Sequence, residues 1–342
     1  AGWKKQTQGE ADPSYYKYLE EQEVRQEYMD FLAQFSGSRL VDGTLLGKWN
    51  GLVHGSGRQG GGETDEERLY SAGKNGEKTE RANPAALVDS PRLRKKLEDY
   101  DYLIQHFFTI HPTASIDRSL MNAETFLSMD LTIRKDEADG PQILIYHTHS
   151  QETFANSIPG NAQTGIMGVG EVLAEILRKQ YGYNVMHHMG QYDVGDRDHA
   201  YANAEGPIEQ LLAENPSIEV VIDLHRDAVD KHMVREVNGV QMAPIMFFNG
   251  LSRTKALGDI SYLNNPNLTG NLAFSLQMQI AAAEYYPNLT RPIYLKGYRY
   301  NMHFKEKYLL IEMGSYTNTQ EEARNAMVPL ADLLNRVLHG EN

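Results

Sequence analysis

Short apolar runs alternate with amphipathic stretches from about residue 143 to the carboxyl end of the chain. The apolar runs predict buried strands, and the stretches whose apolar residues recur every three or four positions predict helices. Strands are predicted at 143–146, 183–187, 218–224 and 308–311, and helices at 167–178, 200–213, 271–285 and 320–338. Because strands that alternate with helices are typical of βαβ units, the pattern predicts an α/β fold. Its sheet should be mostly parallel and twisted, with helices on its faces.

Weaker signals add a few elements. Asn238-Gly239 separates two apolar stretches, 234–237 and 240–248, and predicts a hairpin turn. Residues 126–133 are interpreted as an edge strand that leads into the core. A short helix is expected at 91–98, and the aromatic stretch 100–110 is expected to pack onto the main domain.

The amino-terminal part has a different character. Residues 15–35 carry apolar side chains at helical spacing and predict an amphipathic helix that ends near Gly37. Residues 40–85 are rich in glycine and polar residues and bury too little apolar surface to fold, so they predict a linker or long surface loop. The sequence therefore divides into a helical and Gly-rich extension, 1–98, and a main domain, 99–342.

Composition narrows the function classes. The net charge of −13 argues against a nucleic-acid partner, because phosphate binding needs a basic surface. No apolar run is long enough to span a membrane. The chain begins without Met, so we expect it to be the soluble part of a longer protein whose anchor could have been removed. Because the chain has no cysteine, zinc could be held only by histidines and carboxylates.

Groups that bind metal or move protons follow three of the predicted strands. In a parallel sheet the carboxyl ends of the strands lie at one edge, so these groups should converge there. A catalytic zinc commonly takes two histidines and one carboxylate, with a further carboxylate near its water. A single histidine at a strand end is usually a surface residue, and a lone Glu152 could cap a turn, so the prediction depends on the convergence. The groups are His147, His149 and Glu152 after the first strand, His225 and Asp227 after the third, and Glu312 after the last.

Several segments resemble known families. Residues 312–318, Glu-Met-Gly-Ser-Tyr-Thr-Asn, are similar to the final Glu-x-Gly-Phe-x-Ser-Asn motif of zinc-dependent N-acetylmuramoyl-L-alanine amidases. Four segments resemble stage II sporulation protein P, a peptidoglycan amidase and endopeptidase family of endospore-forming bacteria. They are Ile-Tyr-His-Thr-His-Ser-Gln-Glu (145–152), Ile-Asp-Leu-His-Arg-Asp (222–227), Arg-Tyr-Asn (299–301) and Leu-Ile-Glu-Met-Gly (310–314). The similarity covers about 99–338 and implies an amidase/phosphorylase-like fold.

The resemblance also implies roles for the residues that carry it. His149 and His225 correspond to the two zinc histidines, and Glu312 corresponds to the catalytic carboxylate. The family's usual carboxylate position falls near Ala162, which carries no acid. Glu152 is the nearer substitute as the third zinc ligand, and Glu171 remains a fallback.

Other residues are expected to support the site. His147 is expected to be a partner behind the ligands or a substrate-binding group. Arg226 and Asp227 are expected either to form a pair that orients His225 or to be a solvated ion pair. The remaining supporting residues are Tyr300 and Asn301, which line a groove for the stem peptide or pack a turn, and Asn318, which matches the amidase motif.

The implied activity is cleavage of the amide bond between N-acetylmuramic acid and L-alanine by zinc-activated water, with Glu312 as general base. A second activity on stem-peptide cross-links is implied as well. The resemblance implies that the protein acts during engulfment in endospore formation. Such proteins are anchored in the mother-cell membrane and face the space between mother cell and forespore. The implied partner is stage II sporulation protein D. Two alternatives stay open: another α/β zinc peptidase that acts on short peptides, and a non-catalytic wall-binding scaffold.

Overall fold

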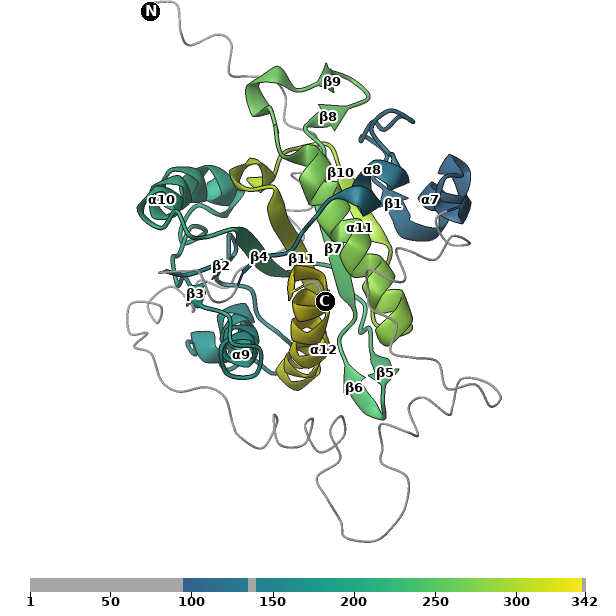
Figure 1. Cartoon of the computed structure of the whole chain (residues 1–342). Coiled ribbons are helices and arrows are strands. Elements are labelled where there is room, and N and C mark those ends of the chain that lie inside the picture. Colours follow the sequence, from purple (N-terminus) through teal and green to yellow (C-terminus); the bar gives the residue numbers. More distant parts are fainter. Residues whose placement is uncertain (1–94, 135–139, 340–342) are drawn as a thin grey trace, which may run out of the picture.

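The computed structural model describes residues 95–134 and 140–339 (Figure 1). The predicted helix at 15–35 and the linker at 40–85 lie outside the described residues. The division at residue 98 therefore stays a prediction. Of the helix predicted at 91–98, residues 95–98 are described, and 95–97 are helical.

A seven-stranded sheet forms the centre of the molecule, in the order β1-β10-β7-β11-β4-β2-β3. Five of its six neighbouring strand pairs are parallel, and β7 pairs with β11 antiparallel. The predicted α/β fold with a mostly parallel sheet is confirmed. In the order of the sheet, the strands are β1 (Phe108–Ile110), β10 (Ile293–Lys296), β7 (Ile245–Gly250), β11 (Lys307–Ser315), β4 (Val220–Asp227), β2 (Ile143–Tyr146) and β3 (Val185–His187).

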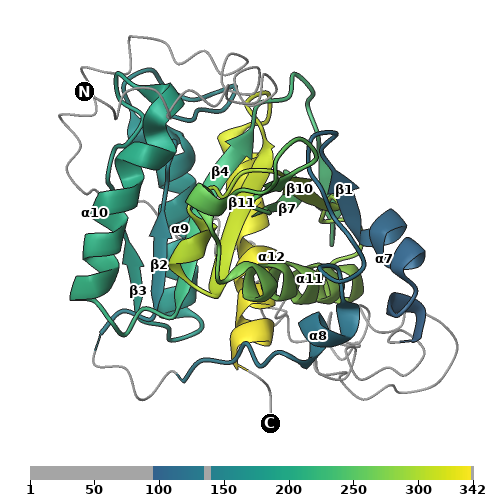
Figure 2. The same ribbon diagram turned by 90° about the horizontal axis from the view of Figure 1, so that it is seen from above.

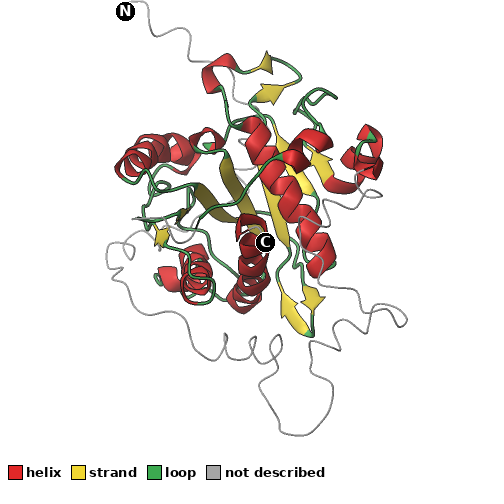
Figure 3. Cartoon of the chain, in the orientation of Figure 1, coloured by secondary structure: helices red, strands yellow, loops and turns green. Residues whose placement is uncertain are grey.

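Helices cover both faces of the sheet (Figures 1, 2 and 3). Alternate residues of each strand point to opposite faces, so β2 supplies Ile143 and Ile145 to one core and Leu144 and Tyr146 to the other. The first core includes residues of α9, α11 and α12, and the second includes residues of α10. The helices are α7 (Tyr100–Phe107), α8 (Ala123–Ser128), α9 (Ile166–Lys179), α10 (Ala200–Glu214), α11 (Leu268–Tyr285) and α12 (Gln320–His339).

The predicted edge strand at 126–133 is wrong. Asn122 accepts a hydrogen bond from the Thr125 backbone N–H at 3.0 Å and thereby caps α8, which ends at Ser128. The edges of the sheet are formed by β1 and β3 instead, and β1 belongs to the aromatic stretch 100–110.

The predicted hairpin forms, but its second arm is shorter than expected. β5 (Arg235–Val237) pairs antiparallel with β6 (Val240–Met242), and Asn238 and Gly239 have the positive φ angles of 53° and 77° that a tight turn requires. Pro244 has no N–H to donate to a strand ladder, and the chain leaves the hairpin there. The apolar residues that follow form β7 in the main sheet.

The last two strands that carry candidate residues are longer than predicted. β4 continues through His225 and β11 continues through Glu312, because the two strands pair in parallel and place these residues opposite each other. Val221 and Leu310 belong to the core under α10. Since side chains alternate along a strand, His225 and Glu312 lie on that same face of the sheet.

Candidate metal centre

The structure brings the three predicted zinc ligands together. The His149 and His225 rings are 5.4 Å apart between centroids, and His225 Nδ1 lies 3.6 Å from Glu152 Oε2. All three residues are completely buried. They meet because β2 and β4 are parallel neighbours, so the loop after β2 turns over the end of β4.

Glu152 is held as a charged acceptor. The Arg226 backbone N–H donates to Glu152 Oε2 at 2.8 Å, and Arg197 Nη2 lies 3.4 Å from Oε1. Burial alone would raise the pKa of the Glu152 carboxyl, but the positive charge of Arg226 and the neighbouring His225 outweigh it and lower this pKa. Glu152 is therefore an ionised carboxylate at neutral pH.

His149 is a neutral imidazole. Burial holds the pKa of His149 well below its usual value, and the nearby Arg197 charge acts in the same direction. Within the described part of the chain neither ring nitrogen makes a hydrogen bond. Nδ1 lies 3.9 Å from Asp193 Oδ2, and Asp193 itself accepts from the Ser150 hydroxyl at 2.7 Å. His149 Nε2 is thus the nitrogen left for a metal.

The His225 ring is turned the other way from the His149 ring, so that Nδ1 rather than Nε2 is left for a metal. Its Nε2 lies 2.8 Å from Asp223 Oδ1, although the angle is poor for a hydrogen bond, and its Nδ1 faces Glu152. Thr148 fixes Asp223 by donating from its backbone N–H at 2.9 Å and from its hydroxyl at 2.7 Å. Burial disfavours protonation of His225, but the charges of Asp223 and Glu152 outweigh burial and raise its pKa well above the usual value.

This donor set fits zinc in its chemistry. Two imidazoles and one carboxylate match a common catalytic zinc site, and each histidine has a carboxylate beside its other nitrogen, as metal-binding histidines usually do. The ligand atoms of His225 and Glu152 lie 3.6 Å apart, but the three ligand atoms do not all lie within 4.8 Å of one another. Among the described residues that closer arrangement occurs at Glu205, Glu209 and His303. The triad His149, Glu152 and His225 therefore stays a prediction.

The alternative carboxylate Glu171 lies elsewhere. Glu171 Oε2 contacts His187 Nδ1 at 2.6 Å, and His187 Nε2 contacts His147 Nε2 at 2.9 Å. His147 Nδ1 donates to the Leu224 carbonyl at 2.8 Å. These three residues form a separate chain of contacts under α9, so Glu152 is the carboxylate beside His225. His147 supports the backbone next to His225 through Nδ1, while its Nε2 contacts His187.

The expected pair of Arg226 and Asp227 does not form. Asp227 Oδ2 contacts Arg291 Nη1 at 2.6 Å, and Arg226 Nε donates to the Thr153 carbonyl at 2.9 Å. Adjacent strand residues point to opposite faces, which separates the two side chains. Arg226 supports the site through its backbone N–H to Glu152.

Asn318 shapes the chain after β11. Its Oδ1 accepts from the Ser315 backbone N–H at 2.9 Å, and its Nδ2 donates to the Met233 carbonyl at 2.6 Å. Gly314 has a φ of 60°, and a Cβ there would lie 2.6 Å from Asn318 Oδ1. Asn318 and Gly314 therefore belong to one tight turn beyond Glu312.

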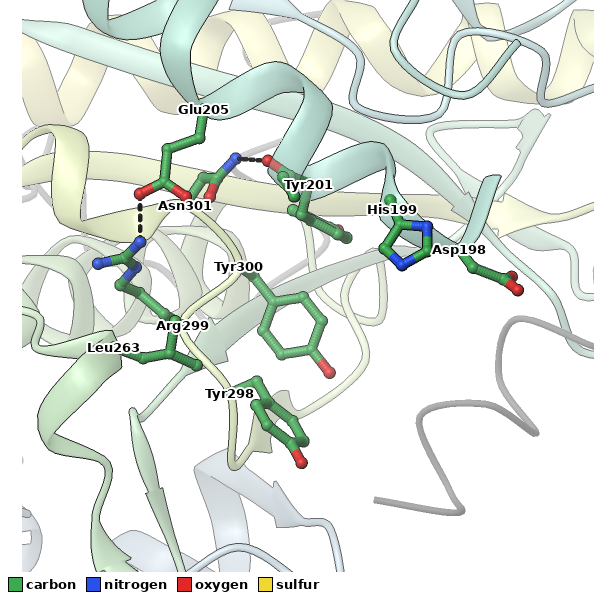
Figure 4. Close-up of a pocket in the computed structure, with 10 residues that line it drawn as sticks. Asp198, His199, Tyr201, Glu205, Leu263, Tyr298, Arg299, Tyr300 and Asn301 are labelled. Atoms are coloured by element: carbon green, nitrogen blue, oxygen red, sulfur yellow. Dashed lines mark hydrogen bonds and ion pairs between the residues drawn. The ribbon is translucent and has the colours of Figure 1, made fainter. Parts of the chain in front are cut away.

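Tyr300 and Asn301 reach the centre through Tyr201. Asn301 Nδ2 donates to the Tyr201 carbonyl at 2.7 Å, and the Tyr300 and Tyr201 rings meet edge to face at 5.2 Å. The Tyr201 ring in turn lies 5.6 Å from the His149 ring. Both residues line a cavity beside the centre (Figure 4).

A sequence model of the stage II sporulation protein P family matches residues 63–335. The chain belongs to this family. It is 22% identical over 223 residues to stage II sporulation protein P of Bacillus subtilis (strain 168), which covers 60% of this chain and 53% of that protein. The chain therefore spans about half the length of this relative.

Family membership confirms the resemblance to stage II sporulation protein P and supports a sporulation-related function. In the described part of the chain, no helix combines the length and the apolar character that crossing a membrane would need.

Sequence reasoning missed three residues beside the centre: Asp193, Arg197 and Tyr201. Asp193 and Arg197 lie between β3 and α10, where no periodic pattern marks a buried position. One signal was available, since an acid and a base four residues apart are a common ion pair, and Arg197 Nη1 lies 3.6 Å from Asp193 Oδ2.

Proposed function

We propose that this chain is the hydrolytic part of a zinc-dependent peptidoglycan amidase that acts in sporulation. The supporting observation is the convergence of His149, Glu152 and His225 in a buried site, with Glu312 opposite His225 on the neighbouring strand. The bond cleaved is the amide between N-acetylmuramic acid and L-alanine. Family membership supports the sporulation context, and the donor set supports hydrolysis.

His149 Nε2, His225 Nδ1 and a Glu152 oxygen would hold the metal. A bound zinc would supply a water with a pKa lowered to about 7 and would polarise the amide carbonyl. Asp193 lies 3.9 Å from His149 Nδ1 and Asp223 lies 2.8 Å from His225 Nε2, which leaves the other nitrogen of each ring for the metal. The Arg226 N–H fixes the third ligand.

Glu312 moves the proton. It is 2% exposed, and strands paired in register lie about 5 Å apart, which places its carboxylate near His225. Glu312 accepts the proton of the attacking water as oxygen bonds to the carbonyl carbon. It then delivers that proton to the amine nitrogen as the C–N bond breaks.

The first test is Glu312→Gln. We expect this variant to keep about one zinc per chain by elemental analysis and to release stem peptides from purified sacculi at least about a hundredfold more slowly. Glu321→Gln, at the exposed start of α12, is the matched control and should release them at the normal rate. Normal release by Glu312→Gln would refute the role of Glu312.

Product analysis separates the proposal from its alternatives. An amidase leaves a free lactyl group on muramic acid, whereas a peptidase acting on short peptides leaves the amide intact. Absence of zinc after zinc supplementation would favour a non-catalytic scaffold. The proposal also includes activity on stem-peptide cross-links, stage II sporulation protein D as a partner, and a position at the mother-cell membrane facing the forespore.

A further inference from the structure

A cavity of about 340 Å³ lies beside the candidate metal centre (Figure 4). It is formed by the start of α10, by the 3-10 helix Ser261–Leu263, and by the loop between β10 and the 3-10 helix Met302–Phe304. Tyr201 belongs to both places, because it lines the cavity and its ring also lies 5.6 Å from His149 and 6.3 Å from His225. A group bound in the cavity would therefore sit next to the bond being cleaved.

Aromatic rings form much of the wall. Tyr201, Tyr298 and Tyr300 line the cavity, and the hydroxyls of Tyr298 and Tyr300 point to the same side of it (Figure 4). Tyr300 is fixed in place, since it packs edge to face on Tyr201 at 5.2 Å and on Phe248 at 4.8 Å. Its φ of 52° is continued by the φ of 56° at Asn301, so the loop holds a conformation that few side chains adopt. The wall is rigid and presents apolar ring surface with polar tips.

The positive groups around the cavity are already paired with carboxylates. The Arg299 guanidinium contacts Glu205, and His199 Nδ1 lies 2.8 Å from Asp196 Oδ1. Asp198 adds a negative charge to the lining. A ligand with several carboxylates, such as a stem peptide, would meet repulsion here, while a neutral polar ring would not.

We propose that this cavity binds one N-acetylated hexosamine ring of the glycan strand. The apolar C–H face of such a ring would pack against the tyrosine rings, and its hydroxyl and acetamido groups would meet the hydroxyl of the half-buried Tyr298. The volume is at the small end of ligand sites and suits about one sugar ring. The inference rests on the proposed function for the identity of the substrate, and it places the glycan on the α10 side of the centre. On this proposal the space lined by Tyr300 and Asn301 takes the sugar ring, whereas the sequence led us to expect a groove for the stem peptide or a packed turn.

The test uses tetra-N-acetylchitotetraose as the probe and titrates it into the full chain by calorimetry or ligand-observed NMR. We expect binding to the unmodified chain and roughly tenfold weaker binding to Tyr298→Ala. Tyr298→Leu keeps much of the apolar volume but removes the aromatic ring, so it should also weaken binding of the probe. It provides the test if Tyr298→Ala fails to fold. Tyr102→Ala, on α7 at the far edge of the sheet, is the matched control and should bind normally.

Three results would overturn the inference: no binding of the probe, equal weakening by Tyr102→Ala, or a stem peptide that binds more tightly than the sugar and depends on Tyr298. Failure of the proposed function is recognised separately, because Glu312→Gln should bind the probe normally while losing hydrolysis. Probe binding by a chain that releases no stem peptides would leave the sugar site standing and refute the amidase. Release of stem peptides without probe binding would refute the sugar site alone.

Discussion

Asp223 offers the sharpest test of how the centre is built. Its carboxylate is completely buried, contacts His225 Nε2 at 2.8 Å and accepts two hydrogen bonds from Thr148. Asp223→Asn keeps the shape and one acceptor oxygen for the Thr148 backbone N–H, and the Thr148 hydroxyl can turn to accept from the new amide group. The substitution removes the negative charge behind His225. Loss of such a partner typically weakens metal binding 10- to 100-fold, or about 1.4–2.7 kcal/mol. We therefore expect zinc affinity to fall by this factor.

The measurement is competition for zinc against a chromophoric chelator, with thermal melting of each variant to show that it folds. Asp227→Asn is the matched control on the same strand, because it removes another buried charge, which pairs with Arg291 instead of His225. Its zinc affinity should stay within about twofold of the unmodified chain. If Asp223→Asn binds zinc as tightly as Asp227→Asn does, the assignment of His225 Nδ1 as the ligand atom is wrong.

Two further predictions concern stability. Burial raises the pKa of the Glu284 carboxyl to about 7. The folded state therefore binds this proton more tightly than the unfolded chain does, so the free energy of unfolding falls as the pH rises from about 4.5 to 7. Glu284→Gln should raise the free energy of unfolding by about 1 kcal/mol at pH 8, a value already reduced for solvent screening. At pH 4 the free energy of unfolding should change little. Urea melts measure both values, and equal effects at the two pH values would contradict this prediction. A Cβ at Gly170 would lie 2.6 Å from His147 Nε2, so Gly170→Ala should destabilise the fold by about 1–3 kcal/mol, whereas alanine normally stabilises a helix interior. Unchanged or increased stability of Gly170→Ala would show that α9 can move away from His147.

The pattern of the sequence predicts the central elements well where a single periodicity dominates. β2 has the predicted bounds, since a breaker precedes it and polar residues follow it, and α10 and α12 begin where predicted. The pattern fails where a local signal competes with hydrophobicity. Asn122 turns an apolar segment into a capped helix, and Pro244 splits an apolar stretch between a hairpin and the main sheet.

In the candidate site, too, some residues could be predicted from the sequence and others could not. His149, Glu152 and His225 were predicted to meet because parallel strands align their ends, and the structure brings them together. Asp193 and Tyr201 were not predicted, because their place beside the centre depends on the path of the chain between β3 and α10. Nothing in the spacing of residues along the sequence encodes that path.

The position of β11 in the sheet has a consequence for biosynthesis. β11 is the last strand in the chain but lies between β4 and β7, so a chain released before Lys307 would hold two half-sheets with open edges. Unpaired strand edges of this kind favour aggregation and recruit chaperones during synthesis. Because Glu312 is carried by the same strand, the sheet closes and the proposed hydrolase gains its proton carrier in one late step. A chain that ends before β11 would therefore leave the sheet open between β4 and β7 and would lack the proposed proton carrier.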